Sequence, residues 1–301
     1  MDDLFYGINA IEFGKRFRCQ ADCQAYLYAI KWKNGYACKF CGCRDEIKGR
    51  TSFHRRCKDC RYDESVLCNT LFEGMRMSIL KAFHLLFRTI SKKKGMSSVE
   101  LATEVGVQQK TAWKFKLKIK NAMVQQSQKK LEGSVQVDET LVGGYSKGNP
   151  GRSLETKSAV LLALEDLGDG KTGNIRMEVI EDFSADIIKI GIENMIAETA
   201  TLKTDKFKSY LKIKKDGKDI ETGLSNKGAF LDQLHKQIMC FKNWLRGTHH
   251  SCSAQYLQTY LDEYNFRFNR RNNRASIFNS IIFRFMNAVP KTYADLKAKC
   301  V

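Results

Sequence analysis

Two Cys-x-x-Cys pairs near the amino end constrain the fold of this chain more than any other feature. The first pair is Cys38 and Cys41, the second is Cys57 and Cys60, and 15 residues separate them. Four thiolates at this spacing can close a tetrahedral zinc site, with Zn–S bonds of about 2.3 Å. So short a segment lacks the apolar area to fold alone, and zinc would supply the missing free energy. The sequence therefore predicts a zinc ribbon here, with unligated cysteines as the alternative.

Length and composition exclude several classes of protein. The chain has 301 residues, 43% of them hydrophobic, which suits about two domains with buried cores. Its longest apolar run, 159–164, is far shorter than the roughly 20 residues that cross a bilayer, so we expect no membrane partner. The first residues are acidic where an export signal is basic, so we expect a cytoplasmic protein, nucleoid-associated if bacterial. In that reducing setting the 11 cysteines favour metal binding over disulfides.

The net charge of +18 is unevenly distributed along the chain. Residues 1–130 carry 26 basic and 12 acidic side chains, residues 131–230 carry 14 and 17, and residues 231–301 carry 11 and 4. Basic ends suit a polyanion such as nucleic acid, and an acidic centre suits carboxylates that hold a metal. Solvated charged faces are the alternative interpretation of the same pattern.

A helix-turn-helix is predicted after the ribbon. Residues 97–105 begin with a capping box and end at Gly106, and a second periodic segment follows. Residues 113–120 fit both a strand's alternation and a helical stripe, so periodicity leaves both open, and the turn before them favours the helix. The start of such a second helix usually contacts base edges, and lysines beside it contact phosphates. The predicted DNA-binding residues are Gln108, Gln109, Lys110, Thr111 and Lys114.

The middle of the chain predicts a ribonuclease-H-like α/β core. Three strands are expected near 134–140, 158–165 and 175–182, then a crossover helix and a fourth strand. Asp138 ends the first strand and Asp205 ends the fourth. Two carboxylates at neighbouring strand ends can bridge Mg²⁺ or Mn²⁺ ions about 3.5–4 Å apart, which serve phosphoryl transfer. The alternative is that both are ordinary strand-end residues.

Four sequence blocks together resemble a known family. They are the paired Cys-x-x-Cys knuckles followed by Cys-Arg-Tyr, QQKTAW (108–113), VDET-x-VGG (137–144), and the tail running from WLRGTHH (244–250) to YLDEYNFRFNRR (260–271). The chain resembles bacterial insertion-sequence transposases of the zinc-ribbon DDE group, with an ISXO2-like transposase domain, which are relatives of the eukaryotic Merlin elements. The resemblance covers nearly the whole chain.

The resemblance implies a set of catalytic residues. Asp138 and Asp205 match the family's first two metal-binding aspartates, and the third acidic or amide position falls on Cys240, with the accompanying lysine at Lys242. Cysteine offers sulfur, whereas Mg²⁺ prefers oxygen. Three interpretations stay open: this copy is impaired, two aspartates suffice, or Asp232 supplies the oxygen.

The resemblance also implies a function and an organisation. The expected fold class is α+β multidomain, with a zinc ribbon (1–70), a helix-turn-helix (71–130) and a ribonuclease-H-like catalytic core (131–290). The expected activity is Mg-dependent cleavage and transfer of DNA strands at the terminal inverted repeats of an insertion sequence, by a homodimer or larger assembly on double-stranded DNA. Arginines of the tail are expected to bind phosphates, with a solvated face as the alternative; these are Arg267, Arg270 and Arg271.

Two other functions remain open at this stage. One is a catalytically impaired, transposase-derived DNA-binding protein, which Cys240 favours. The other is a nuclease or resolvase with a ribonuclease-H fold, which would not need a reader of terminal repeats. His249 and His250 follow Gly247 and are expected in a loop near the active site, where they could contact DNA or assist proton transfer.

Overall fold

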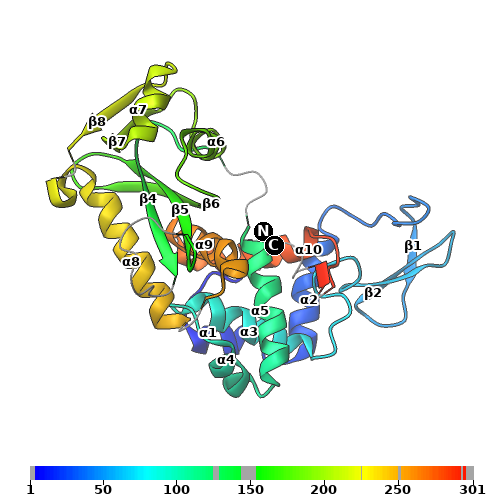
Figure 1. The fold of residues 1–301 in the computed structure, drawn as a ribbon. Coiled ribbons are helices and arrows are strands. Elements are labelled where there is room, and N and C mark those ends of the chain that lie inside the picture. Colours follow the sequence, from blue (N-terminus) through cyan, green and yellow to red (C-terminus); the bar gives the residue numbers. More distant parts are fainter. Residues whose placement is uncertain are drawn as a thin grey trace. The chain divides into compact units, whose positions relative to one another are not determined.

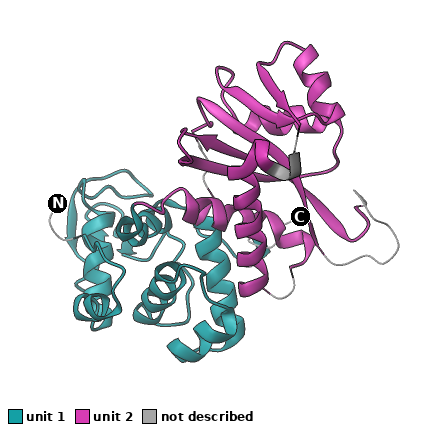
Figure 2. Ribbon diagram, turned by 90° about the vertical axis from the view of Figure 1, so that its left-hand side faces the viewer, with its two compact units in different colours: residues 1–122, 273–299 teal, residues 123–272, 300–301 magenta. Residues whose placement is uncertain are grey.

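The computed structural model of the chain describes residues 4–124, 129–143, 154–224, 226–249, 252–292 and 294–295. It divides into two units, one made of residues 1–122 and 273–299 and the other of residues 123–272 and 300–301 (Figure 2). The first unit is therefore built from both ends of the chain. The division at residues 70, 130 and 290 stays a prediction, and the contacts place 273–290 with the first unit.

Helices around an aromatic core form most of the first unit. Ser78 accepts a hydrogen bond from the backbone N–H of Lys81 and so caps the third helix, whose apolar face is buried. The core includes Phe13 and Phe87, whose rings stack with centroids 4.1 Å apart, and Phe278 from near the carboxyl end. The helices are α1 (Ala10–Arg16), α2 (Gln20–Lys31), α3 (Ile79–Ser91), α4 (Ser98–Val105), α5 (Gln109–Met123) and α10 (Ile277–Asn287), with a short 3₁₀ helix η2 (Arg274–Ser276) before α10.

The predicted ribbon is a small antiparallel sheet. Its strands are β1 (Glu46–Lys48), β2 (His54–Cys57) and β3 (Asp63–Ser65), in the order β1-β2-β3. Lys31 of α2 binds the carboxylate of Glu64, with Nζ 2.7 Å from Oε1, and both side chains are nearly buried. This ion pair fastens the sheet to the helical part of the unit.

The predicted helix-turn-helix is present as α4 and α5. Ser97 caps α4 by accepting from the N–H of Glu100, and Gly106 ends it at a φ of 65°, a left-handed conformation that suits glycine. The ambiguous segment 113–120 is helical, because Phe115 and Ile119 bury one helical face. Lys116 is buried too, and its ammonium donates to the backbone carbonyl of Met96. Because a buried lysine interrupts the apolar helical pattern, the sequence alone left this segment ambiguous.

A five-stranded sheet forms the centre of the second unit (Figure 1). Its order is β6-β5-β4-β7-β8; β4, β5 and β6 are antiparallel, whereas β7 runs parallel to both β4 and β8. The strands are β4 (Ser134–Gly143), β5 (Lys157–Asp166), β6 (Thr172–Ile180), β7 (Thr201–Asp205) and β8 (Ile220–Gly223). The expected run of three strands, a helix and a fourth strand is confirmed.

Helices cover both faces of this sheet, because its strands alternate apolar side chains between two cores. Val135 and Val137 of β4 pack in one core with α6 (Ala185–Met195) and α7 (Lys208–Lys215). Residues such as Leu162 and Met177 pack in the other core with α8 (Asp232–Thr248) and α9 (Ala254–Phe268). A 3₁₀ helix, η1 (Asn226–Leu231), leads into α8. The unit is thus a layered α/β structure.

No helix among the described residues is long and apolar enough to cross a membrane.

Candidate functional site

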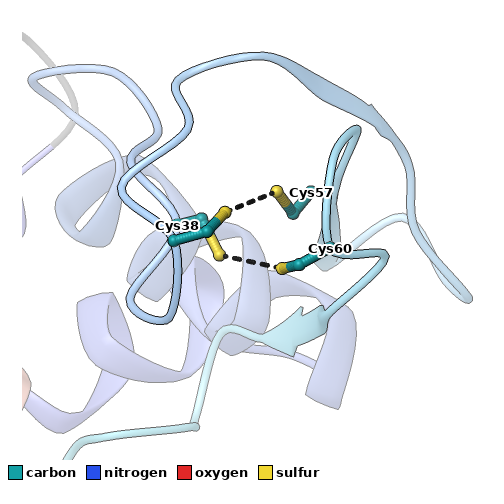
Figure 3. Close-up of side chains that lie close together, drawn as sticks. Cys38, Cys57 and Cys60 are labelled. Carbon is teal, nitrogen blue, oxygen red and sulfur yellow. Dashed lines mark hydrogen bonds between the residues drawn. The ribbon is translucent and has the colours of Figure 1, made fainter.

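The four cysteines of the two predicted pairs converge at one end of the ribbon. Their sulfur atoms all lie within 4.8 Å of one another. Sγ of Cys38 is 3.5 Å from Sγ of Cys60, and Sγ of Cys41 is 3.4 Å from Sγ of Cys57. Figure 3 shows the side chains of Cys38, Cys57 and Cys60 pointing towards one another. Tetrahedral Zn–S bonds of about 2.3 Å require sulfurs about 3.8 Å apart, so the donor set fits a structural zinc ion.

Backbone groups prepare one of these thiols to bind a cation. The N–H groups of Cys41 and Phe40 donate to Cys38 and lower the pKa of its thiol to about 6. A lowered pKa favours the thiolate, which is the form that binds metal. The knuckle that holds Cys38 and Cys41 includes Gly42 at a φ of 73°, a left-handed turn that folds the pair back towards the second pair.

The two predicted catalytic aspartates are brought to the same place on the sheet of the second unit. Strands β4 and β7 run parallel and pair Ser134 with Thr201, an offset of 67 positions. The same offset relates Asp138 to Asp205, two positions beyond the last registered pair. Asp205 ends β7 as predicted, but the expectation that Asp138 ends the first strand is wrong, because β4 continues to Gly143 through its pairing with β5. Strand alternation turns both away from the α6 core and towards α8.

Helix α8 presents His235 to the first of these aspartates. Nε2 of His235 lies 2.8 Å from Oδ2 of Asp138. The start of α8 is held on the same strand, because Oε1 of Gln136 accepts from the backbone N–H of Leu234 at 3.1 Å. Asp205 is held locally, since its Oδ1 accepts from the N–H of Phe207 at 2.9 Å.

Burial and charge make the Asp138 carboxylate a place where a cation would be stabilised. Burial raises the pKa of Asp138 above its ordinary value, hydrogen bonds from His235 and from the N–H of Glu139 oppose this, and the charge of Asp205 raises the pKa further. A buried carboxylate next to a like charge is relieved by a bound cation. The oxygens of Asp138 and Asp205 therefore fit a hard metal such as Mg²⁺ or Mn²⁺.

Lys242, the predicted partner of the third catalytic position, lies on the same side of α8 as His235. Seven residues separate the two, which is about two helical turns. Burial and the charge of Arg246 lower the pKa of Lys242, and the charge of Asp138 opposes them. Asp138, His235 and Lys242 thus lie between the central strand β4 and helix α8.

Cys240 is not part of this group. It is exposed, and five residues along a helix place it about 140° around the axis from His235. Of the described residues, the four ribbon cysteines alone form a set of three or more candidate ligands this close together. Asp138, Asp205 and His235 do not form such a set, although His235 contacts Asp138, and the roles of all four predicted catalytic residues stay predictions.

The predicted DNA-binding residues of the first unit lie at the start of α5. Gln108, Lys110, Thr111 and Lys114 all line one groove of this unit. Gln109 points elsewhere, because its Nε2 donates to Oγ of Ser98 on α4 at 2.9 Å. Their role as DNA contacts stays a prediction.

The three tail arginines have structural partners within the second unit. Arg267 forms a nearly buried ion pair with Glu263, with Nη2 2.8 Å from Oε1. Arg270 stacks over the ring of Phe266 at 4.0 Å, and Arg271 stacks over Phe268 and donates to the backbone carbonyl of Thr172. These contacts place the arginines in the α9–β6 packing, and their predicted phosphate contacts stay predictions.

His249 packs in the same unit, whereas His250 lies outside the described residues. The imidazole of His249 contacts the rings of Tyr260 and Trp244, with centroids 4.3 and 5.9 Å away. Its surroundings are those of a packed aromatic residue.

Comparison with known proteins decides the family of the second unit. Residues 130–269 match the family model described as the ISXO2-like transposase domain. This segment, just under half of the chain, is similar to that transposase domain. A search of curated proteins found no match. Among solved structures, a pre-cleavage Mos1 transpososome is similar to it at 11% identity, over 65% of this chain and 76% of that chain, with a TM-score of 0.28, too low to support any argument.

Sequence reasoning overlooked one residue of this transposase domain, His235. The signal was present, because His235 and Lys242 share a helical face that excludes Cys240. A helical wheel of residues 232–248 places His235 beside Lys242. The packed histidine became visible as a site residue only when strand β4 placed Asp138 opposite it.

Proposed function

We propose that the chain is a transposase that cleaves and transfers DNA strands at the ends of an insertion sequence. The observation that carries the proposal is the equivalent placement of Asp138 and Asp205 on parallel strands of a segment that matches a transposase family. Two carboxylates at this position suit phosphodiester chemistry with divalent metal.

The sheet topology supports a ribonuclease-H-like core. Three antiparallel strands lead through helix α6 to β7, which returns parallel to the first of them. This arrangement brings the first half of β4 beside β7 although the two are far apart in the sequence. The fold therefore explains why Asp138 and Asp205 meet.

Asp138 and Asp205 would hold Mg²⁺ or Mn²⁺, and His235 would orient Asp138 from the helix on which the resemblance places the third position at Cys240. When bound, the metal would activate water or a 3′-hydroxyl and stabilise the leaving oxygen. Carboxylate oxygens suit both Mg²⁺ and Mn²⁺, so we expect either metal to support the reaction.

The chain's own side chains would orient the reacting groups. His235 fixes the carboxylate of Asp138 by its hydrogen bond, and Lys242 offers a cation to the scissile phosphate. Glu139 points to the opposite face of β4, where it interacts with the buried hydroxyl of Tyr210. These residues would position the DNA strand for in-line attack.

The first unit would recognise the terminal inverted repeats. A zinc ion held by the four cysteines would fix the ribbon, and α5 would enter the major groove. Two ends must be cut together, so the active form would be a dimer or larger assembly on double-stranded DNA.

Cys240 motivates the second candidate, a DNA-binding protein that has lost catalysis. Cys240 is exposed and lies apart from Asp138. The presence of a cysteine at this position is therefore a weak reason to infer lost activity. The histidine beside Asp138 favours the active enzyme.

An assay in cells separates these functions. A plasmid would carry a resistance marker between the two stretches of DNA that flank this chain's gene, and the chain would be supplied from a second plasmid. A transposase moves the marker into new sites with both ends intact. A nuclease or resolvase breaks or inverts the plasmid without insertion, and a binding protein leaves it unchanged while still protecting the flanks from digestion.

A further inference from the structure

A groove of about 790 Å³ lies within the first unit, built from three segments that are distant in the sequence. Residues 73–77 form one wall, the first three turns of α5 form another, and residues 290–292 close it from the carboxyl end. The first segment lies in the predicted helix-turn-helix region, 71–130, but no residue of the first or the last segment was among the predicted DNA contacts. The N–H of Leu71 donates to the carbonyl of Phe285 at 2.9 Å, which helps to bring them together.

The lining of the groove is strongly basic around an apolar base. Its ionisable side chains are five basic and one acidic, a formal net charge of +4, namely Arg76, Lys110, Lys114, Lys118, Lys291 and Glu73. Met75, Met77 and Pro290 provide apolar surface between them. Lys291 is held in place by a hydrogen bond to Oδ1 of Asn121 on α5. Cations around an apolar base suit a ligand with both negative charge and an apolar part.

The spacing of the cations suits a polymer better than a single anion. Lys110, Lys114 and Lys118 follow one another every four residues on α5, so they rise along the groove in steps of about 6 Å. The ammonium of Lys118 also donates to the backbone carbonyl of Leu71 at 2.7 Å, so Lys110 and Lys114 are the lysines of this row that we expect to reach phosphates. Arg76 and Lys291 add charge from the other two segments. One small anion could contact only part of this row, whereas a sugar-phosphate strand offers repeated charges and apolar sugars.

We propose that this groove binds the sugar-phosphate backbone of one DNA strand, with Arg76 and Lys291 as phosphate contacts beside the start of α5. The inference rests on the proposed function, because it takes DNA as the ligand of the first unit. It adds a composite site in which the carboxyl-terminal segment, 290–292, takes part in DNA recognition. Gln108 and Thr111 line the same groove, so the strand would be gripped next to the residues predicted to contact bases.

The test is a salt titration of DNA binding by the full chain. The probe is a duplex containing the DNA that flanks this chain's gene, and the variants are Arg76→Gln, Lys291→Gln and the double variant. Each lost phosphate contact should reduce the slope of log K against log salt by about 0.9, and the double variant should lose about 1.8. Lys291→Arg keeps the charge and should restore the slope. The matched control is Lys15→Gln, an exposed lysine of α1 outside the groove, which should leave the slope unchanged.

The outcomes are distinguishable. A wild-type chain that binds the duplex with the same salt slope as both groove variants overturns the groove site and leaves the proposed function standing. A wild-type chain with no salt-dependent binding overturns both. Variant melting temperatures equal to the wild type show that a reduced slope reflects lost contacts and not misfolding. If poly-glutamate competes as well as duplex DNA of equal charge, the groove binds an acidic protein and the proposal fails.

Discussion

Nε2 of His235 lies 2.8 Å from Oδ2 of Asp138, although 97 positions separate the two residues. The contact connects the start of α8 to the middle of β4, next to the strand that ends at Asp205. It assigns a histidine, and not the exposed Cys240, to the place beside the first aspartate. If the chain cleaves DNA as proposed, we expect the reaction to depend on His235.

Replacing His235 should impair cleavage more than replacing Cys240. We expect His235→Ala to lower the rate of DNA cleavage about 10–100-fold and to raise the Mn²⁺ concentration needed for half-maximal rate, because Asp138 loses its orienting partner. Cys240→Ser should change neither quantity. His235→Gln, which keeps a hydrogen-bond donor for Asp138, should recover part of the loss. Equal effects of His235→Ala and Cys240→Ser on cleavage would contradict this assignment.

Stability of the second unit should fall as pH rises from about 4 to 7 because of Asp262. Burial raises the pKa of Asp262 from 3.8 to about 6, the charge of Glu178 raises it further, and a hydrogen bond from Gln258 and the charge of Arg176 oppose these effects. A raised folded-state pKa means that the protonated form suits the fold, so its stabilising contribution is complete below pH 3.8 and is lost through pH 6.

Asp262→Asn should remove this loss. Thermal melting between pH 4 and 7 should show a variant that is more stable than wild type at pH 7, by on the order of 2–3 kcal/mol, with the difference closing by pH 4. Asp186→Asn is the control, since that side chain is 82% exposed. If the difference in unfolding free energy between wild type and Asp262→Asn stays constant from pH 4 to 7, the pKa of Asp262 is not raised.

One zinc ion per chain should be required for DNA binding. Cys57 is fully buried among the four sulfurs, so Cys57→Ser should abolish zinc binding and lower the melting temperature of the first unit. Cys252→Ser, which lies outside the cluster, should retain one zinc ion by elemental analysis. Zinc content unchanged in Cys57→Ser would contradict the site.

The carboxyl-terminal helix α10 should stabilise the first unit. Phe278 is 1% exposed, and its ring lies 5.5 Å from Phe5 and 5.6 Å from Phe83, centroid to centroid. Phe278→Ala should cost about 3–5 kcal/mol of unfolding free energy in urea titrations. Val289→Ala, at a side chain that is 75% exposed, should cost less than about 0.5 kcal/mol. Similar costs for both variants would show that α10 does not belong to this core.

Features set by local spacing could be predicted from the sequence. The paired cysteines and the strands that carry Asp138 and Asp205 depend on short-range patterns, and the structure has the sulfurs together and the aspartates in equivalent positions. The helix at 113–120 was ambiguous, because the alternating Lys116 is buried and not solvated. A hydrophobicity pattern counts every lysine as exposed, so it cannot show that this lysine is buried with its ammonium bound to the Met96 carbonyl.

Features that depend on distant contacts could not be read from the sequence. Nothing near residue 278 indicates that its phenylalanine packs with Phe13 and Phe17, more than 260 positions away. The arginines of the tail looked like phosphate ligands, yet Glu263 and neighbouring rings contact them in the fold. Their partners are set by how α9 packs on β6, which local charge counts do not reveal.

The central claim is that Asp138 and Asp205 form the catalytic site, and strand cleavage in vitro tests it most directly. Purified chain, Mg²⁺ or Mn²⁺ and a fragment carrying this chain's gene with its flanking DNA would be analysed for nicked ends. We predict cleavage at the gene's flanks by wild type and by Asp186→Asn, and at least a hundredfold less by Asp138→Asn and by Asp205→Asn, with binding to the fragment retained. Cleavage that survives in Asp138→Asn and Asp205→Asn would contradict the account.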